Sequence, residues 1–359
     1  MKAWLLAGTV LLATLFSACG GTQAETSGDK REEQQGMEQQ AFTVDTPIEQ
    51  VMEDPAFGNY GRLLFPVNQG YYSGDTLGEL QLTYYSHIDP EKTVEIANYL
   101  KDRALAGQTV FYDIYTPEEK AQDPAKENTG LFFFKGEPGA KFAICNAGGA
   151  FAYVGAMHDS FPHALELSKR GYNAFALIYR PGAQTACEDL ARAIRFVMDN
   201  ADTFGVSTED YALLGYSSGG QIAGVFGNEE KGWGRYGVPK PGVLLLAYPI
   251  NNFFGAKPAY HLLMDTDRLE RRYYSYTVSK LVTPDYPPTF LWYGRNDLML
   301  KAFVYPLQGP TLAKALEASG VPNRVEVYDN AKHGIGIGVG TDAEDWVERA
   351  AEFWQSVSE

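Results

Sequence analysis

From residue 109 onward, short apolar runs alternate with longer segments whose apolar residues recur at helical spacing. The short runs predict buried strands, and the longer segments predict helices that cover them. The predicted strands are 109–116, 130–135, 141–145, 172–179, 211–214, 243–248, 289–293 and 324–328. The predicted helices are 158–170, 186–200, 221–226, 311–319 and 343–357, while 117–128 is helical or looped. This alternation indicates an α/β protein with a mostly parallel central sheet and helices on both faces.

The segment before this alternation has signals of its own. Asp89-Pro90 is an N-cap and first-turn pair that predicts the start of a helix. Residues 58–85 are rich in glycine and tyrosine and too loop-rich to form an independent domain. We therefore expect residues 42–107 to be an N-terminal extension that packs on a catalytic domain at 108–359. Its clustered tyrosines would add a wall to the catalytic pocket.

The first residues of the chain are typical of a targeting signal. Met1-Lys2 is a brief cationic start, and residues 3–16 are an apolar run too short to span a bilayer comfortably. Small residues follow and end in Cys19. This arrangement resembles a bacterial lipoprotein signal, whose cysteine becomes lipidated and N-terminal after cleavage. The resemblance implies a signal peptide at 1–18 and lipid attachment at Cys19.

Residues 19–41 contain mostly polar and small side chains without apolar periodicity, so we expect a flexible tether. With the lipid anchor, this predicts a protein of the cell envelope, attached on the extracytoplasmic side of a bacterial membrane. The alternative is ordinary secretion, with cleavage nearby and a free cysteine.

Composition and charge limit the kinds of partner and cofactor that we expect the protein to bind. The 359-residue chain carries a formal charge of −15, which argues against nucleic acid and against electrostatic docking to anionic lipid. Two further cysteines, Cys145 and Cys187, are expected to be buried thiols, and a disulfide between them stays open. The sequence shows neither a metal-ligand spacing such as H-E-x-x-H nor a nucleotide-binding loop, so we expect no cofactor and no metal.

A nucleophile elbow is the clearest catalytic signal. The run at 211–214 leads into Gly215-Tyr216-Ser217-Ser218-Gly219, which fits the G-x-S-x-G pattern. Glycines are needed on both sides because a serine on a sharp strand-to-helix turn has strained backbone, and flanking side chains would collide with it. The pattern predicts Ser217 as the nucleophile, with the N–H of Ser218 directed at the same point. A plain small-residue turn is the alternative that the pentapeptide alone leaves open.

A serine nucleophile needs a base, and the base needs a third group to hold its tautomer. His333 follows a predicted strand and precedes a glycine-rich loop that leaves its imidazole room to move. Asp297 lies in the loop after another predicted strand, whereas Asp329 comes too close before the histidine to be the first choice. The order Ser217, Asp297, His333 is that of the α/β-hydrolase triad, with His333 as base and Asp297 as its orienting acid.

The sequence Asn146-Ala147-Gly148-Gly149 directly follows the strand at 141–145, where donors to a tetrahedral intermediate would be needed. Together, the elbow, acid, histidine and this loop resemble the α/β-hydrolases, and more narrowly their carboxylesterase and acetylesterase branch with an HGGG-type loop. The resemblance covers residue 109 to the C-terminus. It implies that Gly148 and Gly149 join Ser218 as oxyanion-hole donors. Asn146-Ala147 stand where His-Gly is common, and Asn146 is expected to brace the loop.

These features predict a serine hydrolase that cleaves carboxylic esters. We expect a short-acyl carboxylesterase or acetylesterase whose substrate is a small-molecule or carbohydrate ester. A serine peptidase of the same fold and a catalytically inactive surface-binding lipoprotein are the alternatives. Residues 251–280 are expected to form a cap insertion that sets selectivity, through the aromatic residues Phe253, Phe254, Tyr260, Tyr273, Tyr274 and Tyr276.

Two further polar pairs precede or begin predicted helices. His158-Asp159 could enter the rim of the pocket, but the N-terminal turn of a helix explains it better. Glu188-Asp189 is interpreted as an acidic pair in the first turn of the next helix, where it would favour the helix dipole.

Overall fold

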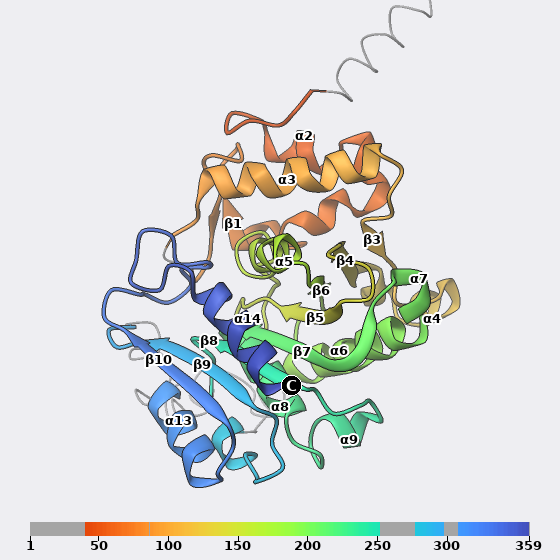
Figure 1. Ribbon diagram of the computed structural model, residues 1–359. Coiled ribbons are helices and arrows are strands. Elements are labelled where there is room, and N and C mark those ends of the chain that lie inside the picture. Colours follow the sequence, from red (N-terminus) through yellow and green to blue (C-terminus); the bar gives the residue numbers. More distant parts are fainter. Residues whose placement is uncertain (1–39, 86, 252–276, 298–307, 359) are drawn as a thin grey trace, which may run out of the picture. The chain divides into compact units, whose positions relative to one another are not determined.

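The computed structural model describes residues 40–85, 87–251, 277–297 and 308–358, and the chain from Ala41 forms one compact unit. Its apolar runs form a sheet whose strands are β3 (Phe111–Tyr112), β4 (Gly130–Phe134), β5 (Lys141–Asn146), β6 (Asn173–Ile178), β7 (Ser207–Tyr216), β8 (Val243–Ala247), β9 (Thr289–Gly294) and β10 (Asn323–Tyr328). The strand order is β10-β9-β8-β7-β5-β6-β4-β3 (Figure 1). Every pair from β10 to β6 is parallel, and β4 and β3 join antiparallel at one edge.

Helices cover this sheet on both faces. The described helices are α2 (Ile48–Met52), α3 (Pro90–Leu105), α4 (Pro117–Gln122), α5 (Ser160–Lys169), α6 (Ala183–Asp199), α7 (Ala201–Phe204), α8 (Ser218–Phe226), α9 (Trp233–Tyr236), α13 (Gln308–Ala318) and α14 (Trp346–Val357). Helices α5 and α14 lie on one side of the sheet, and α6 and α8 lie on the other (Figure 1). The prediction of a mostly parallel central sheet with helices on both faces is confirmed.

Short 3-10 turns and a small hairpin complete the described elements. The turns are η1 (Pro55–Leu64), η2 (Gln69–Tyr71), η3 (Pro124–Asn128) and η5 (Val278–Lys280), and the hairpin pairs β1 (Tyr72–Ser73) with β2 (Gln81–Leu82). Among the described residues, no helix combines the length and the apolar character needed to cross a membrane.

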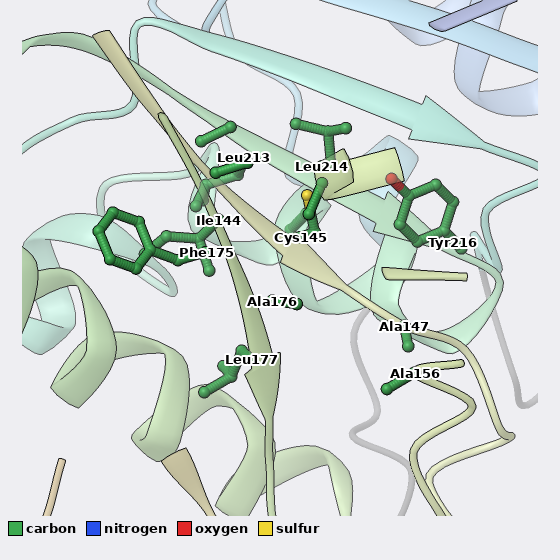
Figure 2. Packing of buried hydrophobic residues seen from close by; sticks show 14 of the residues in the cluster. Ile144, Cys145, Ala147, Ala156, Phe175, Ala176, Leu177, Leu213, Leu214 and Tyr216 are labelled. Carbon is green, nitrogen blue, oxygen red and sulfur yellow. The ribbon is translucent and has the colours of Figure 1, made fainter. Parts of the chain in front are cut away.

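The middle of the sheet is apolar on both faces, as expected for parallel strands covered by helices. Cys145 of β5 lies opposite Leu214 of β7 and Ala176 of β6, and all three side chains are fully buried. Figure 2 shows this packing. Fully burying a leucine-sized side chain contributes about 1.5–3 kcal/mol. The strands therefore form a rigid platform whose carboxyl ends meet at one edge.

Residues 42–107 contact the rest of the unit through apolar and ionic groups. The ring of Tyr60 stacks on Phe111 of β3 at 5.1 Å and meets Phe132 of β4 edge-on at 5.8 Å. Glu95 of α3 forms an ion pair of 2.7 Å with Lys169 of α5. The segment is therefore tied to the β3–β4 edge of the sheet and to α5, while Lys101 of α3 forms a buried ion pair of 2.8 Å with Asp54 within the segment itself.

The predicted strand at 109–116 is wrong in extent, because only Phe111 and Tyr112 pair with β4. The residues that follow turn toward α6 instead. The carbonyl of Ile114 accepts a hydrogen bond from the Arg192 guanidinium, and the Tyr115 hydroxyl donates to Asp189 at 2.7 Å. Partners on a helix replace the ladder partners that a longer strand would need.

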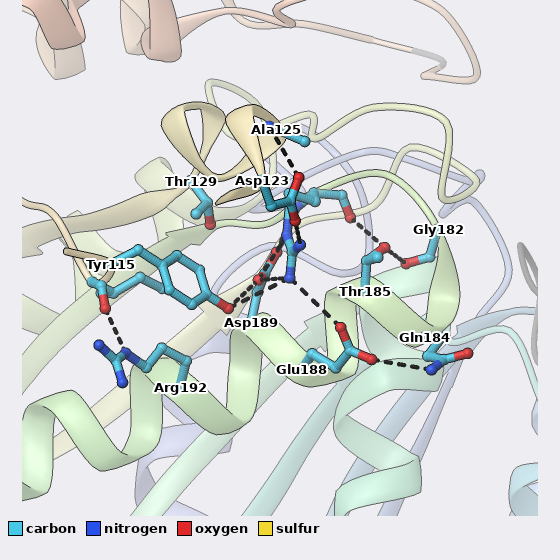
Figure 3. Close-up of polar contacts among 12 residues, drawn as sticks. Tyr115, Asp123, Ala125, Thr129, Gly182, Gln184, Thr185, Glu188, Asp189 and Arg192 are labelled. Atoms are coloured by element: carbon cyan, nitrogen blue, oxygen red, sulfur yellow. Dashed lines mark hydrogen bonds and ion pairs between the residues drawn. The ribbon is translucent and has the colours of Figure 1, made fainter. Parts of the chain in front are cut away.

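The interpretation of Glu188-Asp189 as a first-turn acidic pair is also wrong. Helix α6 begins at Ala183, so Asp189 lies beyond its first turn. Its fully buried carboxylate accepts from the guanidinium and from the backbone N–H of Arg180, each at 2.7 Å. Figure 3 shows this cluster, which also includes Tyr115 and Asp123. Asp189 therefore joins α6 to the end of β6, and its role is structural.

Candidate active site

Ser217 occupies the sharp turn between β7 and α8, with φ 51° and ψ −118°. A methyl group at Gly219 would overlap the carbonyl oxygen of Asn146, and one at Gly215 would overlap that of Gly219. The Ser217 N–H donates to the carbonyl of Ala247 at 3.2 Å, which fixes the turn against β8. The spacing of the motif therefore reflects close backbone approach, and it leaves the serine at the carboxyl edge of the sheet.

Three side chains from separate loops meet at this edge. Nε2 of His333 lies 2.9 Å from Oγ of Ser217, and Nδ1 lies 2.8 Å from Oδ2 of Asp297. A carboxylate only accepts, so Nδ1 carries the proton and Nε2 is left to accept the serine proton. Asp297 and His333 are both buried, which keeps water from competing for these bonds. Asp329 is instead exposed and pairs with Arg295 at 2.6 Å.

The loop after β5 lies directly beside the serine. A methyl group at Gly148 would come 2.9 Å from Cβ of Ser217, so the loop can approach the nucleophile only because this residue is glycine. Its N–H donates to Oδ2 of Asp159 at 2.9 Å. The expectation that the Gly148 N–H serves as an oxyanion donor does not fit this arrangement, because that hydrogen is already bonded. Ser218 begins α8, so its own N–H has no intrahelical acceptor.

The side chain of Asn146 holds the start of the loop after β5 against the strands. Its side-chain amide donates to the carbonyls of Leu214 in β7 at 2.8 Å and of Ile144 in β5 at 3.2 Å. The hydroxyl of Tyr179 donates to the carbonyl of Ala147 at 2.6 Å. These three bonds hold the start of the loop at the strand ends.

Asp159 is the residue of the site that sequence reasoning missed. Its carboxylate does not cap α5, as the interpretation of His158-Asp159 as a plain helix turn would require. It is fully buried and accepts from the hydroxyls of Tyr85 and Tyr248, each at 2.7 Å, besides the Gly148 N–H. A usable signal was the charge itself, since Asp159 stands in a stretch that is otherwise mostly apolar. A charge in such surroundings needs specific partners.

The hydroxyls of Tyr85 and Tyr248 are both suited to donate a hydrogen bond to Asp159. Burial raises the pKa of the Tyr85 and Tyr248 hydroxyls well above the ordinary value, and the neighbouring Asp159 carboxylate raises it further. The hydroxyls therefore stay protonated and can only donate toward the carboxylate. The Tyr248 ring also meets the imidazole of His333 edge-on at 5.1 Å.

A second histidine holds the loop that carries the first. Nε2 of His158 lies 2.8 Å from the carbonyl oxygen of Gly334, and the proton must be on the nitrogen because a carbonyl only accepts. Burial lowers the pKa of His158, which favours its neutral form. Gly334 has φ 64°, a left-handed conformation that glycine adopts readily. The backbone next to His333 is thus fixed by a hydrogen bond and by a glycine turn.

The remaining predicted residues lie apart from the site or outside the described residues. Cys145 and Cys187 are buried free thiols, and burial raises the pKa of Cys145 to about 12. Cys19 and all six aromatic residues of the expected cap lie outside the described residues. Within the described ranges, no cluster of three or more potential metal ligands occurs.

Comparison with known proteins places this arrangement in a structural class. A family model described as BD-FAE matches residues 135–233. The chain is 23% identical over 216 residues to endo-1,4-beta-xylanase B of Butyrivibrio fibrisolvens, which covers 56% of this chain and 32% of the xylanase. It is 25% identical over 245 residues to ethyl acetate hydrolase of Pseudomonas putida, which covers 63% of this chain and 71% of that protein.

Among solved structures, the acetyl ester-xyloside bifunctional hydrolase from Caldicellulosiruptor lactoaceticus superposes with a TM-score of 0.57 at 23% identity. The superposition covers 69% of this chain and 96% of the other. The chain therefore has the α/β-hydrolase fold, and the resemblance predicted from the sequence is confirmed at this level.

Proposed function

We propose that this protein is a serine hydrolase that cleaves carboxylic esters through an acyl-enzyme on Ser217. The observation that carries the proposal is the hydrogen-bonded chain from Ser217 through His333 to Asp297, with bonds of 2.9 and 2.8 Å. A hydroxyl gains nucleophilicity when a base held in the correct tautomer can take its proton. The backbone strain at Ser217 is consistent with such a site, since strained conformations gather where function requires them.

The proposed reaction has two steps. Oγ of Ser217 attacks the ester carbonyl while His333 accepts its proton, and the resulting oxyanion accepts hydrogen bonds from the N–H groups of Gly149 and Ser218. The tetrahedral intermediate collapses, the alkoxide leaves with the proton from His333, and the acyl group stays on the serine. Water then attacks the acyl-enzyme, again with His333 as base, and releases the carboxylic acid and free Ser217.

Esters are the favoured substrates over peptides because of the named activities of the similar proteins. One relative is an ethyl acetate hydrolase, and the structural neighbour is an acetyl ester-xyloside hydrolase. These activities support a short-acyl esterase or acetylesterase, and the xylanase relative supports carbohydrate esters as substrates. A serine peptidase would use the same triad, and an inactive surface-binding lipoprotein could retain the fold.

A fluorophosphonate probe tests the proposal directly. We expect covalent labelling of Ser217 in the full chain, loss of labelling in Ser217→Ala, and strong reduction in His333→Ala. The wild type should release p-nitrophenol from p-nitrophenyl acetate and leave peptide anilides intact. Cleavage of anilides in preference to esters would favour the peptidase, and absence of both labelling and turnover would favour the inactive surface protein.

The proposal extends to the location of the enzyme. The apolar run at 3–16 followed by Cys19 supports a lipid anchor on the extracytoplasmic side of a bacterial membrane, with 19–41 as tether. Metabolic labelling with a fatty-acid probe tests the anchor, because Cys19→Ala should abolish labelling and release the protein from membranes. Labelling that persists in this variant would refute the anchor without affecting the esterase assignment.

A further inference from the structure

Tyr85 belongs to the N-terminal segment 42–107, yet its side chain reaches the centre of the catalytic loops. Its ring lies against glycines of two loops. A methyl group at Gly155 would come 2.7 Å from Cζ of Tyr85, and one at Gly334 would come 2.7 Å from its Cδ1. Side chains at either glycine would exclude the ring, so the two loops have the shape needed to receive it.

The hydroxyl of Tyr85 lies close to the nucleophile. A methyl group at Gly148 would be 3.0 Å from this oxygen and 2.9 Å from Cβ of Ser217. The two atoms are therefore separated by no more than the sum of these distances. A residue of the N-terminal segment thus lies within one side-chain length of the proposed nucleophile.

Backbone strain accompanies this placement. Tyr84 has φ 76°, a left-handed conformation that is unusual for an aromatic residue, and the Tyr85 N–H closes a turn onto the carbonyl of Leu82 at 3.3 Å. Strain of this kind persists only where the surrounding structure enforces it. The turn directs two neighbouring tyrosines differently: the Tyr84 side chain is exposed, whereas the Tyr85 hydroxyl bonds to the fully buried Asp159.

The Asp159 carboxylate depends on neutral donors. Within the described part of the chain, it forms no ion pair with lysine or arginine. Its Oδ1 accepts from Tyr248, and its Oδ2 accepts from both Tyr85 and the Gly148 N–H. Removing the Tyr85 hydroxyl leaves Oδ2 with the Gly148 N–H alone. A buried carboxylate that has lost one of three donors is held less firmly and keeps an unmet demand for a hydrogen bond.

We infer that Tyr85 is a positioning residue of the active site, which acts through Asp159 on the Gly148–Gly149 loop. Its hydroxyl fixes the Asp159 carboxylate, the carboxylate fixes the Gly148 N–H, and the direction of the next N–H, that of Gly149, follows. The inference rests on the proposed function, in which Gly149 donates to the oxyanion. The N-terminal segment is then part of the catalytic apparatus.

Tyr85→Phe tests this inference, because it removes one oxygen and keeps the ring between the two loops. We expect kcat for p-nitrophenyl acetate to fall about 10- to 100-fold with KM nearly unchanged, since a donor that matters only in the transition state changes kcat. The second-order rate of fluorophosphonate labelling should fall by a similar factor. The thermal midpoint should also fall because the buried carboxylate loses a donor, so kcat is compared per folded molecule.

Tyr153→Phe is the matched control. The Tyr153 hydroxyl donates to the carbonyl of Thr83, so it ties the same N-terminal segment to the catalytic loops, whereas the hydroxyls bonded to Asp159 are those of Tyr85 and Tyr248. If the hydroxyl of Tyr85 only held the segment in place, both variants would lose thermal stability and keep their kcat per folded molecule. That result would overturn the inference.

A double-mutant cycle with Asp159→Asn provides the second measurement. If Tyr85 acts through Asp159, Tyr85→Phe should lower kcat little further once Asp159 has been replaced. Additive losses would show that the tyrosine acts by another route and would refute the inference. Absence of labelling and turnover in the wild type would instead refute the proposed function, so the two failures are distinguishable.

Discussion

Replacing Asp189 with asparagine isolates the buried ion pair that joins α6 to the end of β6. The substitution keeps the shape of the side chain and removes its charge. In the wild type, the carboxylate accepts from the Arg180 guanidinium and backbone N–H at 2.7 Å each and from the Tyr115 hydroxyl at 2.7 Å. An amide can offer only one oxygen to these donors, and its NH₂ group must face at least one of them.

The expected loss of stability depends on the partners that the Arg180 guanidinium retains in the variant. Its side chain is 9% exposed, so the guanidinium cannot recover its hydration after Asp189 is neutralised. Breaking a buried pair by removing one partner typically costs about 3–5 kcal/mol. Asp123 still contacts the guanidinium, but it is 39% exposed and therefore offsets only part of the loss. We expect the free energy of unfolding to fall by about 3 kcal/mol.

Urea unfolding of the wild type and Asp189→Asn measures this loss as a shift in midpoint at unchanged slope. Asp329→Asn is the control, because Asp329 pairs with Arg295 on the surface, where both side chains are mostly exposed, and this variant should unfold like the wild type. A loss under about 1 kcal/mol in Asp189→Asn would refute the reasoning, since it would mean that the Arg180 charge is satisfied without Asp189.

Three further predictions concern the elbow and the core. Gly219→Ala should either fail to fold or lose at least about 3 kcal/mol of its free energy of unfolding, because the added methyl group would overlap the Asn146 carbonyl. In the same urea assay, Gly237→Ala should lose only about 1 kcal/mol, because a methyl group at Gly237 meets no neighbouring atom. The free energy of unfolding of Ser217→Gly should be about 1 kcal/mol higher than that of Ser217→Ala, because glycine relieves the strain at φ 51°. Equal free energies of unfolding in the two variants would argue against strain. Burial lowers the pKa of His163 well below that of the unfolded chain, so its contribution to stability is present above about pH 6.5 and falls by about 1.4 kcal/mol per pH unit below it. Unfolding from pH 7.5 to 5.5 should therefore show a steeper loss in the wild type than in His163→Leu.

The proposed triad could be predicted because the sequence signals for its three residues are local. Ser217, Asp297 and His333 each follow a strand that ends in a loop, and parallel strands bring such loops to a single edge of the sheet. The helices and strands were predictable for the same reason, since apolar periodicity reports burial directly. No long-range information was needed for either.

The groups around Asp159 could not be predicted in this way. Its hydroxyl donors lie 74 and 89 positions away in the sequence, at Tyr85 and Tyr248. Tyr85 stands in a loop without periodicity, so no pattern indicates which of its neighbouring tyrosines turns inward. Asp189 was misinterpreted for a related reason, because its partner Arg180 lies beyond the end of β6 and not on the same helix. Polar pairs of this kind depend on tertiary packing, and sequence spacing contains no record of it.

Strained backbone gathers around the proposed site. Among the described residues, seven other than glycine have positive φ, and five of them belong to the elbow, to the segments that flank it, or to the turn before Tyr85: Tyr84, Ala150, Phe151, Ser217 and Tyr248. At about 1–3 kcal/mol each, their combined strain is comparable to the whole net stability of an ordinary domain. The strands β4 to β8 must offset it, since most of their side chains, including those of 211–216 in β7, are buried and apolar. The gathering of five of these seven residues around the proposed site is best explained by the geometry that Ser217, the Gly148–Gly149 loop and Tyr85 must hold together.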